Sequence, residues 1–372
     1  MIKGKPEIRH LLKGWYDQNK RDLPWRSTVD PYSIWISEVI LQQTRVRQGQ
    51  DYYQNFISHY PDVQSLAQAG EEDILRHWQG LGYYTRARNL LQAARIIHTR
   101  YNNRIPDTYK ALASLPGIGD YTASAILSIA FGKTYPVVDG NVRRVISRLL
   151  AITLPVNSPR GRSGIYDAAR DLVDGPEPGT FNQAIMEFGA LCCKPRNPDC
   201  GHCILQCHCM AYRQNLVGSL PAGSTKATPR KRYLNYLVIN VRNPFGTIIL
   251  NRRTSRDIWM NMFDFPSLEP GSLMSLDELV AHPGFKQWIP EKMPPVIEIS
   301  GAAPHILSHQ YLYAKYFLMG IDTIADIHFQ DNWILVHPDQ LNDFPLPRMI
   351  TRFLEKNLHL MGNKFPPFRI NQ

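Results

Sequence analysis

The sequence of 372 residues predicts a mainly α-helical N-terminal half followed by an α+β C-terminal domain. Through the first two hundred residues, apolar side chains recur at spacings of three and four, as on one face of a helix. The stretch 215–232 is rich in Gly, Pro, Ser, Thr and basic residues, which predicts an exposed linker. After it, runs rich in β-branched and aromatic residues predict strands. We therefore expect a helical domain over 1–214 and an α+β domain over 233–372.

The individual elements follow from these periods in chain order. Helical spacing in the N-terminal half is found, between prolines, at 8–18, 32–44, 72–81, 87–101 and 121–131. Strand-like runs follow at 233–241, 247–253 and 311–320, the first two around a turn at 243–246. Helical spacing returns at 275–289 and 347–361.

The composition restricts the classes of partner and compartment. No run approaches the roughly 18 consecutive apolar residues that cross a membrane. The first twenty residues are charged and lack the apolar core of a signal peptide, so we expect a reducing, cytoplasmic setting. The net charge of +10 and the pI of about 9.3 favour a polyanionic partner, of which nucleic acid is the commonest.

Cysteines give the most specific signal. Four of the six have the spacing C-x6-C-x2-C-x5-C, namely Cys193, Cys200, Cys203 and Cys209. Four thiolates suit a tetrahedral zinc or an iron–sulfur cluster. A structural zinc site usually has two closely spaced cysteine pairs and only one is present, so the spacing favours one 4Fe–4S cluster. Cys207 could compete for the fourth position and Cys192 adjoins the first, while disulfides in a secreted protein are the weaker alternative.

The segment LPGIGDYTA contains a second motif. Gly117 and Gly119 allow a tight turn between two helices. The backbone N–H groups of such a turn and of the next helix start can bind a phosphate. This predicts a helix-hairpin-helix element that grips the DNA backbone without reading its sequence. A plain glycine-rich connection is the alternative.

Two carboxyl groups are candidates for acid–base work. Asp139 precedes an amphipathic helix and could simply be its N-cap. Glu38 lies among apolar neighbours and could simply face solvent. If the two meet across a cleft, one could protonate a leaving group and the other stabilise or attack a sugar cation. An apolar environment would raise the pKa of Glu38 and keep it protonated near neutrality.

The chain resembles the MutY family of adenine DNA glycosylases, within the endonuclease III superfamily. The resemblance covers nearly the whole chain and rests on DLPWR, WISEVILQQTRV, QGLGYYTRARNL, LPGIGDYTA, VVDGNVRRV, FNQAIMEFGALCC and the four-cysteine loop. It implies flipping and excision of adenine mispaired with 8-oxoguanine, or with guanine, in duplex DNA. It also implies one 4Fe–4S cluster on the C-x6-C-x2-C-x5-C cysteines, in a protein that is nucleoid-associated when bound to DNA. We expect a monomer.

The resemblance further implies roles for individual residues. Glu38 would protonate N7 of adenine, and Asp139, helped by Tyr121 and Asn141, would stabilise or trap the sugar cation. The adenine pocket would be lined by Arg21, Leu23, Trp25, Arg26, Val46, Gln183 and Glu187. Contacts to DNA or to the 8-oxoguanine side would come from Gln43, Thr44, Leu81, Tyr83, Gly117 and Gly119. The lobes would be a helical barrel over about 29–136 and a cluster lobe of 1–28 plus 137–214.

Position 121 separates two enzyme classes. Lyase relatives have a lysine two residues after the second hairpin glycine, and its amine forms a Schiff base that leads to strand cleavage. Tyr121 stands there and cannot form one, so we expect base excision without efficient strand cleavage. The alternatives are an endonuclease III-like glycosylase and lyase for oxidised pyrimidines, and a non-catalytic iron–sulfur DNA-binding module. The Glu38–Asp139 pair argues against the second.

The C-terminal half resembles the Nudix-like domain of MutY proteins. Residues 249–269 match the strand, basic stretch and aromatic turn of that domain, but 251–280 lacks the glutamate-rich Mg²⁺-binding box. We therefore expect recognition and not pyrophosphate hydrolysis. HILSHQYL matches the loop that contacts 8-oxoguanine, with Leu307 in place of the family's Phe, followed by Ser308 and His309. The substitution removes an aromatic ring, so stacking by this position is not expected.

Overall fold

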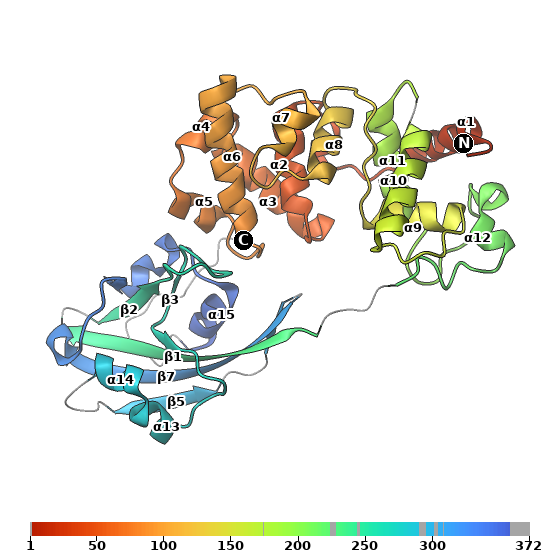
Figure 1. Cartoon of the computed structure of the whole chain (residues 1–372). Coiled ribbons are helices and arrows are strands. Elements are labelled where there is room, and N and C mark those ends of the chain that lie inside the picture. The colour runs from red at the N-terminus through yellow and green to blue at the C-terminus, as the bar shows by residue number, and fades with distance from the viewer. Residues whose placement is uncertain are drawn as a thin grey trace. The chain divides into compact units, whose positions relative to one another are not determined.

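The computed structural model describes residues 2–173, 175–223, 228–243, 246–289, 295–300, 304–307 and 309–357. The chain divides into two compact units. The first comprises 1–69 and 89–226, and the second comprises 70–88 and 227–372. Each unit is treated by itself below (Figure 1).

The N-terminal half is built of helices joined by short loops. They are α1 (Lys5–Asn19), α2 (Pro31–Leu41), α3 (Val46–His59), α4 (Val63–Gln68), α5 (Glu71–His77), α6 (Thr85–Tyr101), α7 (Tyr109–Ala113), α8 (Asp120–Ile129), α9 (Gly140–Leu149), α10 (Pro159–Val173), α11 (Pro178–Leu191) and α12 (Met210–Arg213). Single 3-10 turns lie at Pro24–Arg26 and Gln206–His208. The predicted helical half is confirmed.

Capping residues explain where the key helices begin. Asp30 accepts a hydrogen bond from the backbone N–H of Ser33, and Pro31 stands in the first turn of α2. Asp62 and Ser65 form a capping box at the start of α4. The helix predicted over 32–44 ends at Leu41, and Gln43 adopts a left-handed φ of 59°.

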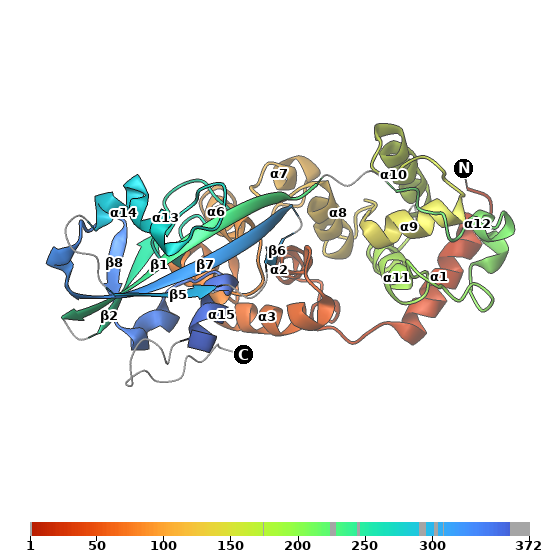
Figure 2. The ribbon, with the colours of Figure 1, turned by 90° about the horizontal axis from the view of Figure 1, so that it is seen from below.

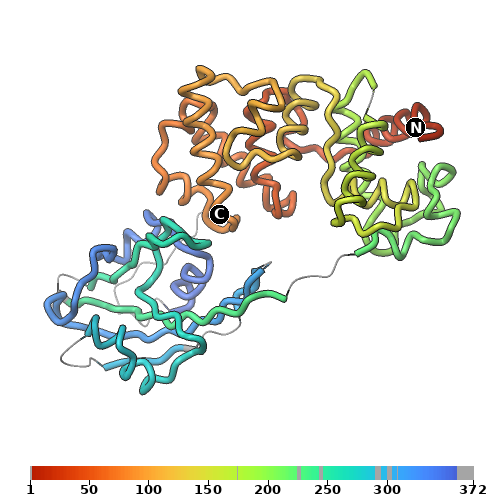
Figure 3. The backbone as a smooth tube through the Cα atoms, viewed as in Figure 1, coloured from red at the N-terminus to blue at the C-terminus, as the bar shows by residue number. Residues whose placement is uncertain are grey.

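The lobe around the cysteine loop is assembled from distant parts of the chain. Helix α1 lies beside α11, as the backbone trace in Figure 3 shows, and α9 packs on the other side of α11. Their apolar faces share one core, which includes Ile8, Leu12, Val145, Ile185 and Phe188. This core brings the first helix next to residues of 137–214.

The C-terminal domain contains one mixed sheet. Its strands are β1 (Arg230–Asn243), β2 (Thr247–Arg252), β3 (Phe263–Asp264), β4 (Ser267–Leu268), β5 (Val296–Ser300), β6 (His305–Ile306), β7 (Gln310–Thr323) and β8 (Trp333–Val336). The central order is β3-β2-β1-β7-β5, with β4 on β1, β6 on β7 and β8 on β2. The long β1 and β7 run parallel, from Arg230 opposite Gln310 to Asn243 opposite Thr323, and are seen side by side in Figure 2. The other pairs are antiparallel.

Helices cover both faces of this sheet, which is why its central strands are nearly continuous apolar runs. The domain's helices are α13 (Leu276–Ala281), α14 (Pro283–Trp288) and α15 (Arg348–Asn357), with 3-10 turns at Ile324–Asp326 and Pro338–Asp343. Leu237 and Phe317 pack in one core with Leu279 of α13 and Phe285 of α14. On the opposite face, the Tyr316 ring stacks on Phe353 of α15 at 3.8 Å between centroids.

Two expectations differ in detail from the structure. The segment predicted as one helix over 275–289 is two short helices, because Pro283 starts a new one after His282. The stretch predicted as linker over 215–232 ends inside β1, and its Leu220 is buried. Within the described ranges, no helix is long and apolar enough to cross a membrane.

Candidate active site

One pocket in the first unit collects the residues that the sequence analysis placed in catalysis and around adenine. It has a volume of about 220 Å³ and is formed by residues of α2, α3, α8, α9 and α11 and of the segment before α2. Every one of those predicted residues lines it, namely Glu38, Tyr121, Asp139, Asn141, Arg21, Leu23, Trp25, Arg26, Val46, Gln183 and Glu187.

Glu38 is a buried acid on α2. Its neighbours Val39 and Ile40 are in the core, and Glu38 itself is only 8% exposed. Burial raises the pKa of Glu38 to about 7, against a hydrogen bond with Tyr121 that lowers it, and Asp139 raises it further. The solvated alternative is therefore wrong, and this carboxyl group holds a proton close to neutral pH.

Asp139 both caps α9 and lines the pocket. Its Oδ1 accepts from the backbone N–H of Val142 at 2.7 Å, and its Oδ2 accepts from Nδ2 of Asn141 at 2.8 Å. Burial raises the pKa of Asp139, and these hydrogen bonds oppose the rise because they favour the ionised form. The two acids thus have different environments, and Asp139 has the donors that stabilise a carboxylate.

The side chain of Asn141 is itself held from behind. Arg144 donates from Nη2 to Oδ1 of Asn141 at 2.9 Å and to the backbone oxygen of Gly189 at 2.7 Å. Its Nε donates to the backbone oxygen of Cys193 at 2.7 Å. A continuous set of hydrogen bonds therefore runs from Asp139 to the first residue of the cysteine loop.

Tyr121 completes the polar side of the pocket. Burial raises the pKa of its phenol well above the ordinary value, and Glu38 and Asp139 raise it further. The hydroxyl therefore stays protonated and acts as a hydrogen-bond donor. It lies 3.7 Å from Sδ of Met186.

Glu187 forms the other wall with two arginines. Arg21 and Arg26 each place both ends of the guanidinium against this carboxylate, at 2.6–2.8 Å. Burial would raise the pKa of Glu187, but the hydrogen bonds from Arg21 and Arg26 outweigh it and hold the pKa well below its usual range. Tyr16 donates to Oε1 of Gln183 at 2.6 Å and so orients its amide.

The pocket also contains residues that the sequence analysis did not select. They are Ile34, Ser37, Leu41, Ile129, Met186 and Ala190, together with Thr44, which had been placed with the DNA contacts. Helical spacing would have found most of them. Ile34, Ser37 and Leu41 share the face of α2 that carries Glu38, and Met186 and Ala190 share the face of α11 that carries Gln183 and Glu187.

The predicted hairpin is present between α7 and α8. Gly117 has a left-handed φ of 77°, and a Cβ there would lie 2.8 Å from Cβ of Asn89. Gly119 is the N-cap of α8 with an ordinary φ of −92°, so the turn requires glycine only at position 117. Gly117, Gly119 and Gln43 are exposed, and Thr44 is half-buried.

The segment 70–88 presents one aromatic side chain to solvent. Tyr83 is 43% exposed and has a left-handed φ of 51°, directly after Gly82 with φ 73°. Its ring lies 5.7 Å from the guanidinium of Arg86. Leu81, in contrast, is buried. Tyr83 is thus available for stacking on a base, whereas Leu81 would first have to leave its packing.

The four predicted ligand cysteines line one cavity, together with Cys192. Apolar side chains of Val145, Leu149 and Phe188 surround it. Cys207 is the exposed one of the six cysteines and lies outside this lining. Arg148 donates from Nη1 to Sγ of Cys193 at 3.3 Å and to the backbone oxygen of Lys194 at 2.7 Å. In the described residues, no group of three or more His, Cys, Asp or Glu side chains could hold a single metal ion.

Comparison with known proteins now identifies the family. Residues 36–157 match the HhH-GPD superfamily of base excision DNA repair proteins, and residues 236–356 match the NUDIX domain. An adenine DNA glycosylase of Buchnera aphidicola from Acyrthosiphon pisum is 31% identical over 353 residues, which is 93% of this chain and 96% of that protein. The Mus musculus adenine DNA glycosylase is 33% identical over 85% of this chain and 71% of that protein.

The chain belongs to the MutY family of adenine DNA glycosylases. The solved structure of a thermostable thymine-DNA glycosylase resembles it with a TM-score of 0.53 and 31% identity. The likeness covers 56% of this chain and 97% of that one. The expected fold, a helix-hairpin-helix glycosylase half with a Nudix-like C-terminal domain, is therefore confirmed.

The turn that MutY proteins are expected to use toward the modified base begins the long strand β7. The backbone N–H of Leu307 donates to the oxygen of Gln310 at 2.8 Å, and that of Arg230 donates to the oxygen of His309 at 3.0 Å. Leu307 is half-buried and His309 is exposed. Ser308 lies outside the described residues.

Proposed function

We propose that this chain flips adenine out of duplex DNA in which it is mispaired with 8-oxoguanine or guanine, and hydrolyses its N-glycosidic bond. The observation that carries the proposal is the pairing, in one pocket of a MutY-family chain, of an acid protonated near neutrality with a hydrogen-bonded carboxylate. An enzyme must take a base out of the stack before it can reach that bond.

The residues divide the chemistry between them. Glu38 gives its proton to N7 of adenine, which makes the base a neutral leaving group as the bond breaks. The carboxylate of Asp139 stabilises the positive charge that develops on the sugar, and Asn141 and the N–H of Val142 hold it in place. Water then supplies the hydroxyl group to the sugar carbon and returns a proton to Glu38.

A single-turnover assay tests this assignment. Wild-type protein should release adenine from an 8-oxoguanine·A duplex, and Asp139→Asn should reduce the rate constant by at least about a thousandfold. Asn is also a good N-cap, so the variant should fold normally. Asp62→Asn, the same exchange at the N-cap of α4, is the matched control and should keep full activity. Full activity in Asp139→Asn would refute the mechanism.

We further propose that the enzyme does not cleave the strand efficiently. Tyr121 occupies the position of the lyase lysine, and its buried phenol cannot form a Schiff base with the sugar. Incubation with a mispaired duplex followed by borohydride should therefore trap little protein on DNA. Strong covalent trapping of the wild type would show an endonuclease III-like lyase.

We propose one 4Fe–4S cluster on the cysteine loop. Cys193, Cys200, Cys203 and Cys209 line a common cavity with an apolar wall, and such a polynuclear group would need more room than a single zinc ion. Lys194, Arg196 and His202 on the same loop are cations for DNA phosphates. Purified Cys209→Ser should lose iron, sulfide and visible absorbance, whereas Cys207→Ser should keep them. Zinc in the wild type would contradict the proposal.

The C-terminal domain is proposed to recognise 8-oxoguanine and not to hydrolyse pyrophosphates. Its carboxylates nearest the former Nudix box, Asp257, Asp264 and Glu269, are ion-paired with arginines. Carboxylates neutralised in this way are poor ligands for Mg²⁺. The whole protein is proposed to act as a monomer, since one lesion requires one pocket.

A further inference from the structure

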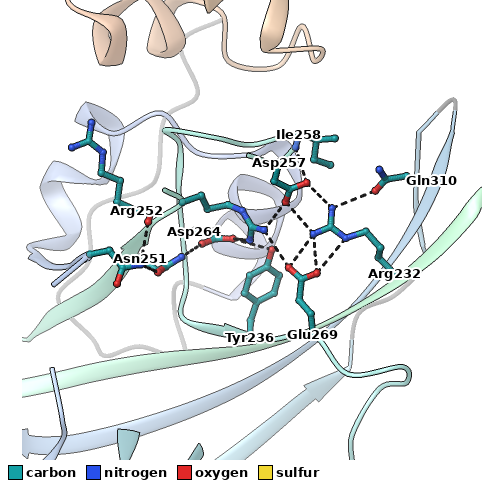
Figure 4. A network of polar contacts seen from close by, with 11 residues as sticks. Arg232, Tyr236, Asn251, Arg252, Asp257, Ile258, Asp264, Glu269 and Gln310 are labelled. Atoms are coloured by element: carbon teal, nitrogen blue, oxygen red, sulfur yellow. Dashed lines mark hydrogen bonds and ion pairs between the residues drawn. The ribbon is translucent and has the colours of Figure 1, made fainter. Parts of the chain in front are cut away.

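A charged network in the C-terminal domain has no part in the chemistry described above (Figure 4). Its centre is Arg253, whose side chain is 8% exposed. Arg253 donates to Oδ2 of the fully buried Asp264 at 2.7 Å and to Oδ2 of Asp257 at 2.6 Å. Asn251 donates to the other oxygen of Asp264 at 2.8 Å. Buried charges paired and hydrogen-bonded in this way hold a fixed geometry.

Arg232 joins this centre to another part of the sheet. It stands on β1, and its Nη1 and Nη2 donate to both oxygens of Asp257 at 2.9 and 3.0 Å. Nη2 also reaches both oxygens of Glu269, at 3.0 and 2.8 Å. In addition, Nη1 donates to Oε1 of Gln310 at 3.3 Å. Figure 4 shows the Arg232 guanidinium between the two carboxylates, with Gln310 on its far side.

Gln310 is the last residue of the turn that begins at Leu307. Its backbone oxygen accepts from the N–H of Leu307, and the preceding His309 is held by the N–H of Arg230. Arg230 and Gln310 are also partners in the β1–β7 register. The turn is therefore anchored by backbone bonds to β1 and by one side-chain bond to Arg232, which in turn grips the 253–269 segment.

We infer that Arg232 is a positioning residue that fixes the Leu307–Gln310 turn and thereby sets the preference for 8-oxoguanine over guanine opposite adenine. The inference rests on the proposed function. An arginine suits this place because its planar fork can meet two carboxylates and an amide at once, which the point charge of a lysine cannot do. Without it, Asp257 and Glu269 would repel each other with only Arg253 between them, and Gln310 would lose its donor.

The test compares single-turnover excision from 8-oxoguanine·A and G·A duplexes. Arg232→Gln should lower the ratio of the two rate constants by about tenfold, the value of one hydrogen bond to a charged group. The rate on G·A should stay near that of the wild type, because the pocket around Glu38 and Asp139 is untouched. Arg232→Lys keeps the charge and should restore part of the ratio.

Two further variants separate positioning from general stability. Arg242→Gln is the matched control, since Arg242 lies on the same strand in an exposed ion pair with Asp322; its ratio should not change. Gln310→Ala removes the link to the turn and leaves the ion pairs intact, so it should lower the ratio even if Arg232→Gln fails to fold.

The outcomes are distinguishable. A wild type that excises adenine equally from both duplexes would refute 8-oxoguanine recognition itself. A wild type with a preference that survives in Gln310→Ala, and in a folded Arg232→Gln, would overturn the positioning role alone. Equal loss on both duplexes in these variants would also overturn it, because it would indicate a general structural effect.

Discussion

At the residue scale, two carboxyl groups in one pocket are given different protonation states by their surroundings. Glu38 sits among apolar side chains, whereas Asp139 receives hydrogen bonds from Val142 and Asn141. The first environment favours a neutral acid and the second an anion. The division of roles between acid and stabiliser is therefore a property of the neighbours and not of the side chains themselves.

The raised pKa of Glu38 has a consequence for stability. Its pKa rises from an ordinary 4.5 to about 7 on folding, so the folded protein holds this proton more tightly than the unfolded chain. The free energy of unfolding of the wild type should therefore fall, relative to Glu38→Gln, as the pH rises from about 4.5 through 7, by about 3 kcal/mol in total. Urea unfolding of both proteins across this range measures the difference.

Glutamine is the matched control because it has the same shape and does not titrate. A constant difference in stability between the two proteins at all pH values would mean that Glu38 is not protonated in the folded state. The rate constant of adenine release should decline in the wild type above the same pH of about 7, since the general acid is then ionised.

At the element scale, the hairpin before α8 depends on one backbone angle. Gly117 holds a left-handed φ of 77°, and a methyl group there would meet Asn89 of α6. The sequence analysis treated Gly117 and Gly119 alike, because spacing shows a turn but not which of its residues has the positive φ. The backbone conformation of the folded turn distinguishes them.

Gly117→Ala should therefore lower the free energy of unfolding by about 1–2 kcal/mol or more, through the strained φ and the contact with Asn89. It should also weaken binding to duplex DNA, because the N–H groups of the turn would shift. Urea unfolding and fluorescence anisotropy measure the two effects.

Gly164→Ala supplies a control of opposite sign. Gly164 is exposed in the middle of α10, and no described atom lies within 4 Å of an added Cβ. This change should stabilise the protein by about 0.5–1 kcal/mol and leave DNA binding unchanged. If Gly117→Ala were as harmless as Gly164→Ala, the strained-turn account would be wrong.

At the scale of the whole molecule, the excess of basic residues fits a long polyanionic partner. The net charge is +10, and the hairpin offers backbone N–H groups in addition. Contacts with phosphates release counterions from DNA, so their number appears in the salt dependence of binding.

Binding to a duplex should weaken steeply with salt. Six phosphate contacts would lower the association constant by roughly a thousandfold between about 50 and 200 mM salt. Titrations at several salt concentrations give the slope of the logarithmic plot. A slope near zero would exclude electrostatic binding of the DNA backbone and leave the positive charge unexplained.

The sequence by itself determined the helical and α+β halves, the cysteine loop, the hairpin, the identity of the two acids and Tyr121 at the lyase position. These are local patterns, since period, spacing and residue type need no knowledge of distant contacts. The tertiary structure alone decided that Glu38 and Asp139 share a pocket, that Cys207 lies outside the cysteine cavity and that Arg232 grips Asp257, Glu269 and Gln310. Each of these depends on burial and on partners from other segments, and burial is what sets a protonation state or fixes an ion pair.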